Sequence, residues 1–235
     1  MLEKYSYDYE YDDKYCYAGS GVLRNKLNID SETDLRNAER EITSMWLLRL
    51  KAEPVKGSFD LDHLCRIHRR VFSDIYPWAG KCRTVDISKG NVFCRAMYIR
   101  EYAQELFSGL AEENWLITAP SEDIPVRLAY YLSEINVLHP FREGNGRTQR
   151  LFTEYLGSVS GCHVDFSAVS ADEMIRASAD AFAKDYGRLN DMFARICTPL
   201  TPVEQEKAIG LFFGVRSSQM KLFRAGRSRQ AQHTK

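Results

Sequence analysis

The sequence predicts a mainly helical fold that carries one β-hairpin. Over most of the 235 residues, apolar side chains recur at spacings of three and four, which is the pattern of amphipathic helices. Residues 82–93 (CRTVDISKGNVF) differ, because β-branched and aromatic residues there flank a Lys-Gly-Asn turn. A hydrophobic content of 44% is enough for one sizeable core, so we expect one domain with short extensions.

The two ends of the chain differ in composition from its middle. Tyrosines are interleaved with acidic residues near the start, and we expect residues 1–30 to form a loose N-terminal arm. After Glu206 the chain has several Lys and Arg but no acidic residue, so we expect residues 198–235 to be a basic, solvated C-terminal extension. Docking to a partner is the alternative for each end. The domain is predicted at residues 31–197, with its core at about 59–195.

The helices of this domain can be placed from their periodicity and end signals. Ser31 can cap a first helix, and a second is predicted at residues 61–75. Further helices are expected at 98–113, 171–182 and 188–197. The apolar stripe of the first helix contains Leu35, Ala38, Ile42, Met45, Trp46 and Leu50.

Two helices flank the most polar run of the chain. The first begins near Ser121 and must end at His139, because Pro140 excludes the α conformation from the residue before it. The second follows a short loop, and we expect it to end at Gly157 as a C-cap. The run therefore lies in a helix-loop-helix.

Charge, cysteine usage and hydropathy exclude several classes of protein. Lys plus Arg and Asp plus Glu both number 32, so no net field attracts the chain to nucleic acid or to an anionic membrane. No run of 18 apolar residues is present, and the start lacks a signal-peptide core. The cysteines have no CxxC spacing, which indicates a reducing compartment. We expect a cytoplasmic protein, with a secreted effector that uses no signal peptide as the alternative.

The run from His139 to Arg150, HPFREGNGRTQR, gathers the groups that suit a phosphate ester and a metal ion. Gly144-Asn145-Gly146 directly precedes a helix, so backbone N–H groups and the positive end of the helix dipole form a cradle for phosphate. Asn145 either caps this helix or donates from its side chain to a phosphate oxygen.

Charged side chains surround this cradle. Arg147 and Arg150 lie three residues apart in the first turn, where two cations oppose the helix dipole unless an anion binds. Glu143 is the only carboxylate of the run, and it either pairs with a neighbouring arginine or reaches Mg²⁺ held by phosphates. His139 either simply ends its helix or accepts a proton from a hydroxyl that attacks the α-phosphorus.

Structural roles are expected for other polar and aromatic residues. Phe141 should point into the core and leave Arg142 pointing outward. His63, Cys65 and His68 hint at a metal site, but the two histidines are five residues apart on different helical faces. We therefore expect no structural zinc there.

The run also resembles the signature of Fic-domain proteins, H-x-F-x-D/E-G-N-G-R-x-x-R, at every specified position. Residues 16–29 (CYAGSGVLRNKLNI), 78–93 (WAGKCRTVDISKGNVF) and 134–141 (EINVLHPF) are similar to bacterial members, so the resemblance covers about residues 15–197. It implies a compact, mainly α Fic fold with a helix-loop-helix active site and one β-hairpin flap at residues 82–95. It also implies transfer of AMP from ATP onto a protein hydroxyl.

The resemblance assigns a role to each motif residue. His139 would be the base that deprotonates a Ser, Thr or Tyr hydroxyl of a target protein, and Glu143 would hold Mg²⁺. The donor ATP would be bound by the amides of the loop and by both arginines, that is by Gly144, Asn145, Gly146, Arg147 on the β-phosphate side and Arg150 at the γ-phosphate. The target would dock on the flap residues Ser88, Lys89, Gly90, Asn91, Val92 and Phe93.

Many Fic proteins inhibit themselves through a Ser/Thr-x-x-x-Glu-Gly/Asn motif, whose Glu pairs with the second motif arginine. Here Glu precedes Gly or Asn only at Glu113 and Glu143, and Gly109 and His139 stand four residues earlier, so the motif is absent. The resemblance therefore implies the class in which a small antitoxin supplies this Glu to Arg150 in trans, with the present chain as the toxin.

Other functions fit less well. The chain has no P-loop, no dinucleotide fingerprint and no GxSxG elbow. The motif alone leaves open transfer of UMP, GMP or phosphocholine on the same fold. A non-catalytic interaction protein is a further alternative, which the intact His139, Glu143 and arginines argue against. We expect neither a nucleic-acid substrate nor a membrane partner.

Overall fold

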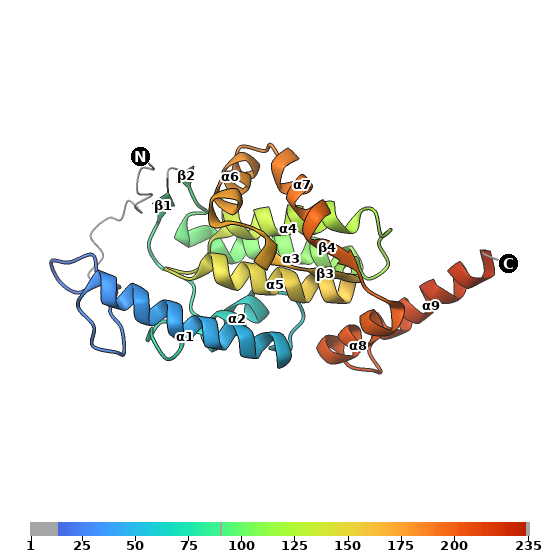
Figure 1. Cartoon of the computed structure of the whole chain (residues 1–235), viewed down its shortest axis with the longest axis horizontal. Helices are drawn as coiled ribbons and strands as arrows, with labels where there is room; N and C mark the ends of the chain where they lie inside the picture. Colours follow the sequence, from blue (N-terminus) through green and yellow to red (C-terminus); the bar gives the residue numbers. More distant parts are fainter. Residues whose placement is uncertain (1–13, 90, 234–235) are drawn as a thin grey trace.

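The computed structural model describes residues 14–89 and 91–233. Within these ranges it contains nine α-helices, three single turns of 3-10 helix and two small antiparallel sheets (Figure 1). This confirms the predicted mainly helical fold with a β-hairpin. The helices are α1 (Glu32–Ala52), α2 (Leu61–Phe72), α3 (Ile99–Glu112), α4 (Ile124–Leu138), α5 (Asn145–Ser160), α6 (Ala171–Phe182), α7 (Gly187–Ile196), α8 (Pro202–Phe213) and α9 (Ser218–His233).

The 3-10 turns span Ala96–Tyr98, Asn114–Leu116 and Phe166–Ala168. Strands β1 (Ser88–Lys89) and β2 (Asn91–Val92) form the predicted hairpin, with Ser88 opposite Val92. These strands are shorter than the apolar pattern suggested, and side chains of the stem before them bond elsewhere, since Arg83 donates to the His139 carbonyl and Thr84 accepts from Lys14. Strands β3 (Cys162–Val164) and β4 (Cys197–Pro199) form a second pair that connects the end of α5 to the end of α7.

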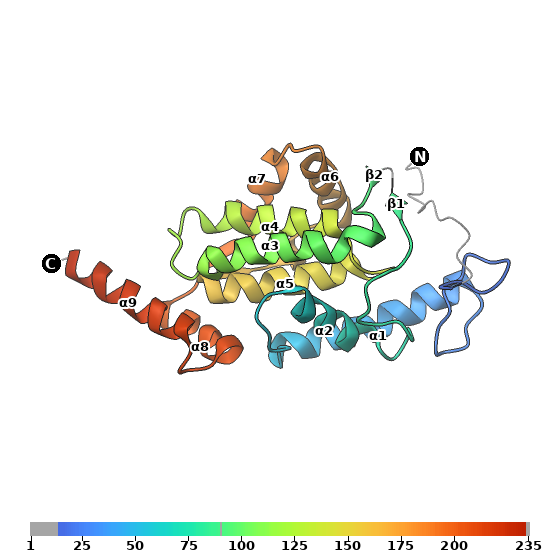
Figure 2. The ribbon, with the colours of Figure 1, turned by 180° about the vertical axis from the view of Figure 1, so that it is seen from behind.

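Helix α5 lies at the centre of the molecule. It packs against α4, α2, α8 and strand β3, while α6 and α7 cover the other side of α4 (Figures 1 and 2). The core is formed by the inward faces of these helices, including Leu128, Leu132, Phe152 and Leu156. No helix in the described ranges is both long and apolar enough to cross a membrane.

Helix α1 begins as predicted, since the Ser31 hydroxyl accepts a hydrogen bond from the Asp34 N–H at 3.4 Å. Its buried face differs from the predicted apolar stripe. Met45 is 67% exposed, whereas Glu39 and Thr43 are buried together with Leu35 and Leu50. The reason is the partner of this face, which is the charged motif loop as well as the core.

Helix α5 continues past the predicted end at Gly157 and stops at Gly161, which has φ 93°. Gly157 serves close packing instead of a cap. A Cβ atom there would lie 2.7 Å from Val164 Cγ2 and 2.9 Å from the Cys162 carbonyl oxygen, so only glycine lets β3 lie this close to α5. Helix α2 also ends at Phe72, three residues earlier than predicted.

The expectations for the two chain ends also change. Residues 1–13, with most of the tyrosines, lie outside the described residues, but Tyr15 and Val22 are buried, so the remainder of the arm is not loose. The C-terminal extension forms helices α8 and α9 instead of a solvated tail. Buried apolar side chains explain this, namely Ile209, Phe212, Met220 and Phe223.

Candidate active site

The loop between α4 and α5 turns sharply at both ends. His139 caps α4 in the left-handed conformation (φ 42°, ψ 58°), and its N–H donates to the Ile135 carbonyl at 3.0 Å. Gly144 precedes α5 with φ 83°, and a Cβ atom there would lie 2.3 Å from Phe72 Cζ. Both the conformation and the lack of space require glycine at this position.

Asn145 ties this loop together. Its Oδ1 accepts the Phe141 N–H at 2.9 Å, and its Nδ2 donates to the Phe141 carbonyl at 2.7 Å. The cap position of α5 belongs to Gly144, so the interpretation of Asn145 as N-cap is wrong. Its side chain is an internal clamp in this structure, and donation from Nδ2 to a phosphate stays a prediction.

The first turn of α5 presents the amides expected of an anion cradle. The first intrahelical bond runs from Thr148 N–H to the Gly144 carbonyl at 3.1 Å. The N–H groups of residues 145–147 therefore precede the hydrogen-bond ladder of the helix and point out of its positive end. An anion placed before this turn would meet several donors at once.

The ring of His139 is held in one orientation. Its Nδ1 lies 3.1 Å from the Asn136 carbonyl oxygen. Because a carbonyl only accepts, Nδ1 carries the proton and the lone pair of the neutral ring is on Nε2. The ring also stacks on Phe93 of the flap, with centroids 3.7 Å apart and planes at 17°. His139 is thus oriented from α4 on one side and from the flap on the other.

Arg83 connects the stem of the flap to this loop. It is buried, and its guanidinium donates to the carbonyls of His139 (2.9 Å), Val85 (2.6 Å) and Cys94. Its own N–H donates to the Pro140 carbonyl at 2.8 Å. Burial lowers the pKa of this guanidinium. The sequence analysis did not select Arg83, because nothing in a single sequence distinguishes it from a surface arginine.

Glu143 lies between the cradle and the arginines. Its Oε1 accepts the Gly144 N–H at 2.8 Å and lies 3.5 Å from Arg147 Nη2. Burial raises the pKa of this carboxyl, and the nearby carboxylate of Glu39 raises it further. The salt bridge considered for Glu143 is therefore present, to Arg147.

Arg147 is held by helix α1. Its Nη2 lies 2.5 Å from Glu39 Oε1, and its Nη1 donates to Thr43 Oγ1 at 3.1 Å. The guanidinium also lies over the Phe72 ring, 4.8 Å from the centroid. Glu143 is thus not the only carboxylate near the motif cations. Glu39 was missed because it lies more than a hundred positions away in sequence.

Arg150, one turn further along α5, has different surroundings. Burial and the neighbouring Arg147 lower the pKa of its guanidinium. In the described part of the chain no carboxylate lies within 4 Å of it. The two motif arginines share a helix end, as predicted, but among the described residues only Arg147 forms ion pairs within 4 Å, whereas Arg150 interacts with Glu154 over a longer distance.

His68 of helix α2 binds the backbone of the motif loop. Its Nδ1 accepts the Gly80 N–H at 2.8 Å, so its Nε2 carries the proton and donates to the Glu143 carbonyl at 2.9 Å. The ring stacks on Phe141, with centroids 3.9 Å apart. Both ring nitrogens of His63 are likewise bonded to backbone, at Phe59 and Val55. The two histidines that hinted at a metal site are thus structural links.

Phe141 and Arg142 lie between Pro140 and Glu143, and only the prediction for Phe141 is confirmed. Phe141 points into the core as expected and is 1% exposed. The prediction that Arg142 points outward is wrong, because its side chain is 1% exposed. Residues of the N-terminal segment cover it, since its guanidinium lies 5.9 Å from the Tyr15 ring centroid and 3.6 Å from Cys16 Sγ.

The flap stands beside the loop. Val92 is 66% exposed, whereas Phe93 is buried against the His139 ring, so strand β2 has an exposed side chain next to one that contacts the motif. Gly90 lies outside the described residues. The structure thus brings the flap to the motif but does not test whether its residues dock a target.

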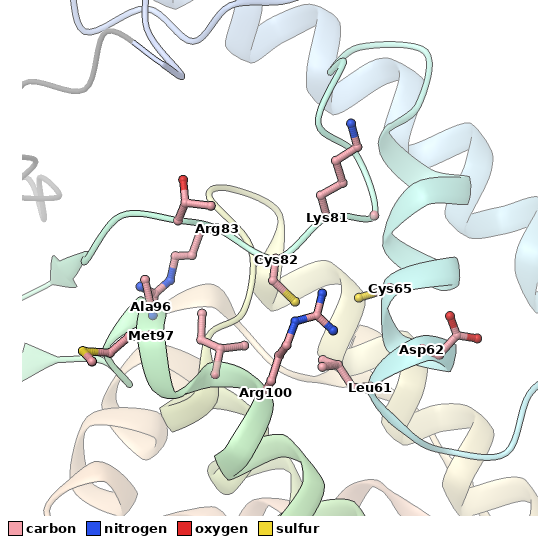
Figure 3. Close-up of a pocket in the computed structure, with 12 residues that line it drawn as sticks. Leu61, Asp62, Cys65, Lys81, Cys82, Arg83, Ala96, Met97 and Arg100 are labelled. Carbon is pink, nitrogen blue, oxygen red and sulfur yellow. The ribbon is translucent and has the colours of Figure 1, made fainter.

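A cavity of about 840 Å³ lies behind the flap stem (Figure 3). It is lined by Arg83, Arg100 and Met97 among others, and by no residue of the run 139–150. The thiols of Cys65 and Cys82 face each other there, and Cys65 and Arg100 lower the pKa of Cys82 to about 7. Nothing in the sequence indicates this cavity, whose lining includes no residue of the motif.

Known proteins resemble this chain in sequence and fold. The model of the Fic/DOC family matches residues 58–156. The protein adenylyltransferase VbhT of Bartonella schoenbuchensis is 37% identical over 205 residues, which are 87% of this chain but 42% of that protein. The probable protein adenylyltransferase Fic of Salmonella typhimurium is 37% identical over 185 residues, which are 78% of this chain and 91% of that protein.

A solved structure agrees with the computed one. The structure of BepC from Bartonella tribocorum, which contains bound AMPPNP, has 26% sequence identity and a TM-score of 0.76. The match covers 81% of this chain and 99% of that one. By its motif, its helical fold with a hairpin and its likeness to protein adenylyltransferases over most of its length, this chain belongs to the Fic/DOC family.

Proposed function

We propose that this chain is a protein adenylyltransferase, which transfers AMP from ATP onto a Ser, Thr or Tyr hydroxyl of a target protein. One observation carries the proposal: a single short loop, residues 139–144, joins the oriented ring of His139 to the anion cradle at the start of α5. A base beside a phosphate cradle is what nucleotidyl transfer needs. The names of the two relatives describe the same activity.

The chemistry follows from the orientation of His139. The target hydroxyl oxygen attacks the α-phosphorus of ATP, and its proton passes to Nε2, the atom that carries the lone pair. The bond from the α-phosphorus to the oxygen bridging to the β-phosphate breaks, and pyrophosphate leaves. The amides of residues 145–147, Arg147 and Arg150 would stabilise the negative charge on the phosphates during this step.

Glu143 would hold Mg²⁺ at this site. The donor set fits, because Mg²⁺ is usually bound by one or two protein carboxylates together with substrate phosphates. Glu143 supplies such a carboxylate, and it already lies against the cradle through the Gly144 N–H at 2.8 Å. When bound, the ion would neutralise part of the phosphate charge.

The flap residues Ser88 to Phe93 would dock the target. An extended target segment can pair with the short edge of this hairpin through its backbone, which is largely independent of side-chain identity. The buried ring of Phe93 and the exposed side chain of Val92 support a hairpin that is anchored to the motif and open to a partner. The target and the residue modified would then be set by contacts beyond the hairpin.

An antitoxin in trans is our proposal for control. Arg150 has no carboxylate within 4 Å among the described residues, and the chain lacks the self-inhibitory motif. A small partner protein that brings a Glu to Arg150 would occupy the γ-phosphate position. Co-expression of a neighbouring gene with the Ser/Thr-x-x-x-Glu-Gly/Asn pattern should then relieve toxicity of this chain, and unchanged toxicity would reject this control.

Label transfer tests the proposed activity. Purified protein is incubated with each α-labelled nucleoside triphosphate and a cell lysate, and labelled bands are identified by mass spectrometry. We expect label from ATP, and label only from another triphosphate would assign a different donor. His139→Ala should abolish transfer and retain nucleotide binding, whereas the control His163→Ala, at an exposed position, should transfer normally. Transfer by His139→Ala at the wild-type rate would reject His139 as the base.

A further inference from the structure

Two side chains of helix α1 bind Arg147, the motif arginine beside the phosphate cradle. Glu39 Oε1 accepts a hydrogen bond from Arg147 Nη2 at 2.5 Å, and Thr43 Oγ1 accepts one from Arg147 Nη1 at 3.1 Å. The family model matches residues 58–156, so α1 lies outside the matched segment. A part of the chain that precedes this segment thus shapes the environment of a motif residue.

Glu39 is itself firmly held. Its second carboxylate oxygen accepts a hydrogen bond from the hydroxyl of Tyr76, which is buried. Burial and the adjacent Glu39 raise the pKa of Tyr76, so its hydroxyl remains a donor. The Thr43 hydroxyl, which accepts from Arg147, donates to the Glu39 carbonyl at 2.7 Å. Tyr76, Glu39, Thr43 and Arg147 therefore form one connected network, buried except for the partly exposed Arg147.

Two carboxylates compete for the same guanidinium. Glu143 Oε1 is 3.5 Å from Arg147 Nη2, one helical turn before it, while Glu39 Oε1 is 2.5 Å away. If Glu39 were absent, Arg147 would be free to close its ion pair with Glu143. That pair would occupy both the arginine and the carboxylate that the nucleotide needs.

We propose that Glu39 is a positioning residue of the nucleotide site, which with Thr43 holds Arg147 toward α1 and limits its pairing with Glu143 to the contact of 3.5 Å, so that the remaining N–H groups of Arg147 serve the β-phosphate. This inference rests on the proposed function. A positioned arginine loses less freedom when phosphate binds than a mobile one, and Glu143 stays available.

The geometry favours positioning over inhibition. An inhibitory contact must be removable, whereas Glu39 is 9% exposed in the middle of α1 and is bonded to Tyr76. Among the described residues, Glu39 pairs with Arg147 and forms no ion pair with Arg150, the arginine that the inhibitory Glu of other members would bind. Thr43 is a neutral acceptor, which orients a guanidinium but does not cancel its charge.

The direction in which Glu39→Gln changes nucleotide affinity distinguishes a positioning role from an inhibitory one. Glu39→Gln removes a negative charge close to the phosphates, which would tighten nucleotide binding if Glu39 only opposed it. If Glu39 positions Arg147, the same variant weakens binding. Thr43→Val removes the second contact without changing the net charge, so it should weaken binding through orientation alone.

Calorimetric titration with ADP and with AMP tests this role. We expect Glu39→Gln to raise the Kd for ADP roughly tenfold, the size of one lost charge-assisted contact, and Thr43→Val to raise it by a smaller factor. AMP lacks a β-phosphate, so its Kd should be unchanged in both variants. Glu41→Gln is the matched control, since it removes the same charge from an exposed position on the same helix.

Each other outcome rejects the role. Tighter or unchanged ADP binding by Glu39→Gln would show that Glu39 does not position Arg147. An equal loss for ADP and AMP would indicate general damage to the site. If Glu39→Gln does not fold, as judged by thermal unfolding, Thr43→Val alone decides the result by the same criteria. A wild-type protein that binds neither nucleotide would reject the proposed function, and the role of Glu39 with it.

Discussion

At the scale of single residues, buried histidines hold the loops around the motif. His68 joins the Gly80 N–H to the Glu143 carbonyl, and His63 joins the Phe59 N–H to the Val55 carbonyl. Each ring accepts at Nδ1 and donates at Nε2, which only the neutral imidazole can do. Protonation of either ring would break one of these links.

This arrangement predicts a loss of stability in acid. Burial lowers the pKa of His63 to about 4 and that of His68 to about 3, from the ordinary value of 6.5. Below pH 6.5 the unfolded chain binds more protons than the folded one, so the free energy of unfolding falls as the pH falls toward these values. At pH 5 each histidine should cost about 2 kcal/mol relative to pH 7.

Urea unfolding at pH 7, 6 and 5 measures this slope. His68→Gln should make the free energy of unfolding less dependent on pH in this range, whatever its effect at pH 7. His163→Gln is the control, since His163 is exposed and its replacement should leave the slope unchanged. A slope that is the same in wild type and His68→Gln would contradict the assignment of a buried neutral ring.

At the scale of elements, the motif depends on how the flap and the two central helices meet. The flap stem is tied to the motif loop by Arg83, and to the end of α4 by the Cys94 N–H, which donates to the Val137 carbonyl at 2.9 Å. Phe93 completes the connection through the His139 ring. The hairpin is therefore stabilised mainly by tertiary contacts, since its own strands are two residues each.

The second half of α5 yields a prediction about packing. Gly157→Ala places a methyl group 2.7 Å from Val164 Cγ2 and 2.9 Å from a backbone oxygen, and the backbone cannot simply give way. We expect a loss of about 1–3 kcal/mol in the free energy of unfolding, as for other overpacked sites. If Gly157 were a C-cap instead, the packing of β3 would not be disturbed.

Gly109 provides the matched control in α3. A Cβ atom there meets no atom within 4 Å, and the residue is inside a helix. Gly109→Ala should therefore stabilise the protein by up to about 1 kcal/mol through helix propensity. Urea unfolding of both variants should give opposite signs, and stabilisation by Gly157→Ala would refute the packing argument.

At the scale of the whole molecule, the C-terminal helices complete the core beside α5. The Phe212 ring of α8 lies 5.1 Å from the rings of both Phe59 and Tyr155, and 6.0 Å from His63. Helix α8 begins with a capping box of Thr201 and Glu204. Figure 2 shows α8 and α9 extending from one end of the helical body.

Removal of this aromatic contact should destabilise the molecule as a whole. Phe212→Ala is expected to lower the free energy of unfolding by about 3 kcal/mol, as for other buried phenylalanines. Leu211→Ala, at a neighbouring position that is 39% exposed, should change it by less than about 0.5 kcal/mol. Equal effects of the two substitutions in denaturant unfolding would show that α8 does not pack as a part of the core.

The sequence alone was sufficient for most helices of the predicted domain and for the motif loop, because both depend on local information. Helical periodicity, the Ser31 cap and the break at Pro140 act within a few residues, and they placed α1, α4 and α6 close to their observed bounds. The same holds for the anion cradle, which needs only a glycine-flanked turn before a helix. The family signature then indicated what such a loop does.

The tertiary structure decided which distant residues complete the site. Glu39, His68 and Arg83 reach the motif from other elements, and their sequence positions do not reveal this. It also decided the burial of Arg142, which was expected to point outward opposite Phe141, and the packing of the C-terminal helices, which the composition had suggested to be solvated. The physical reason is that burial and charge pairing depend on which surfaces meet. Polar residues of one helix become structural only when another element brings a partner to them.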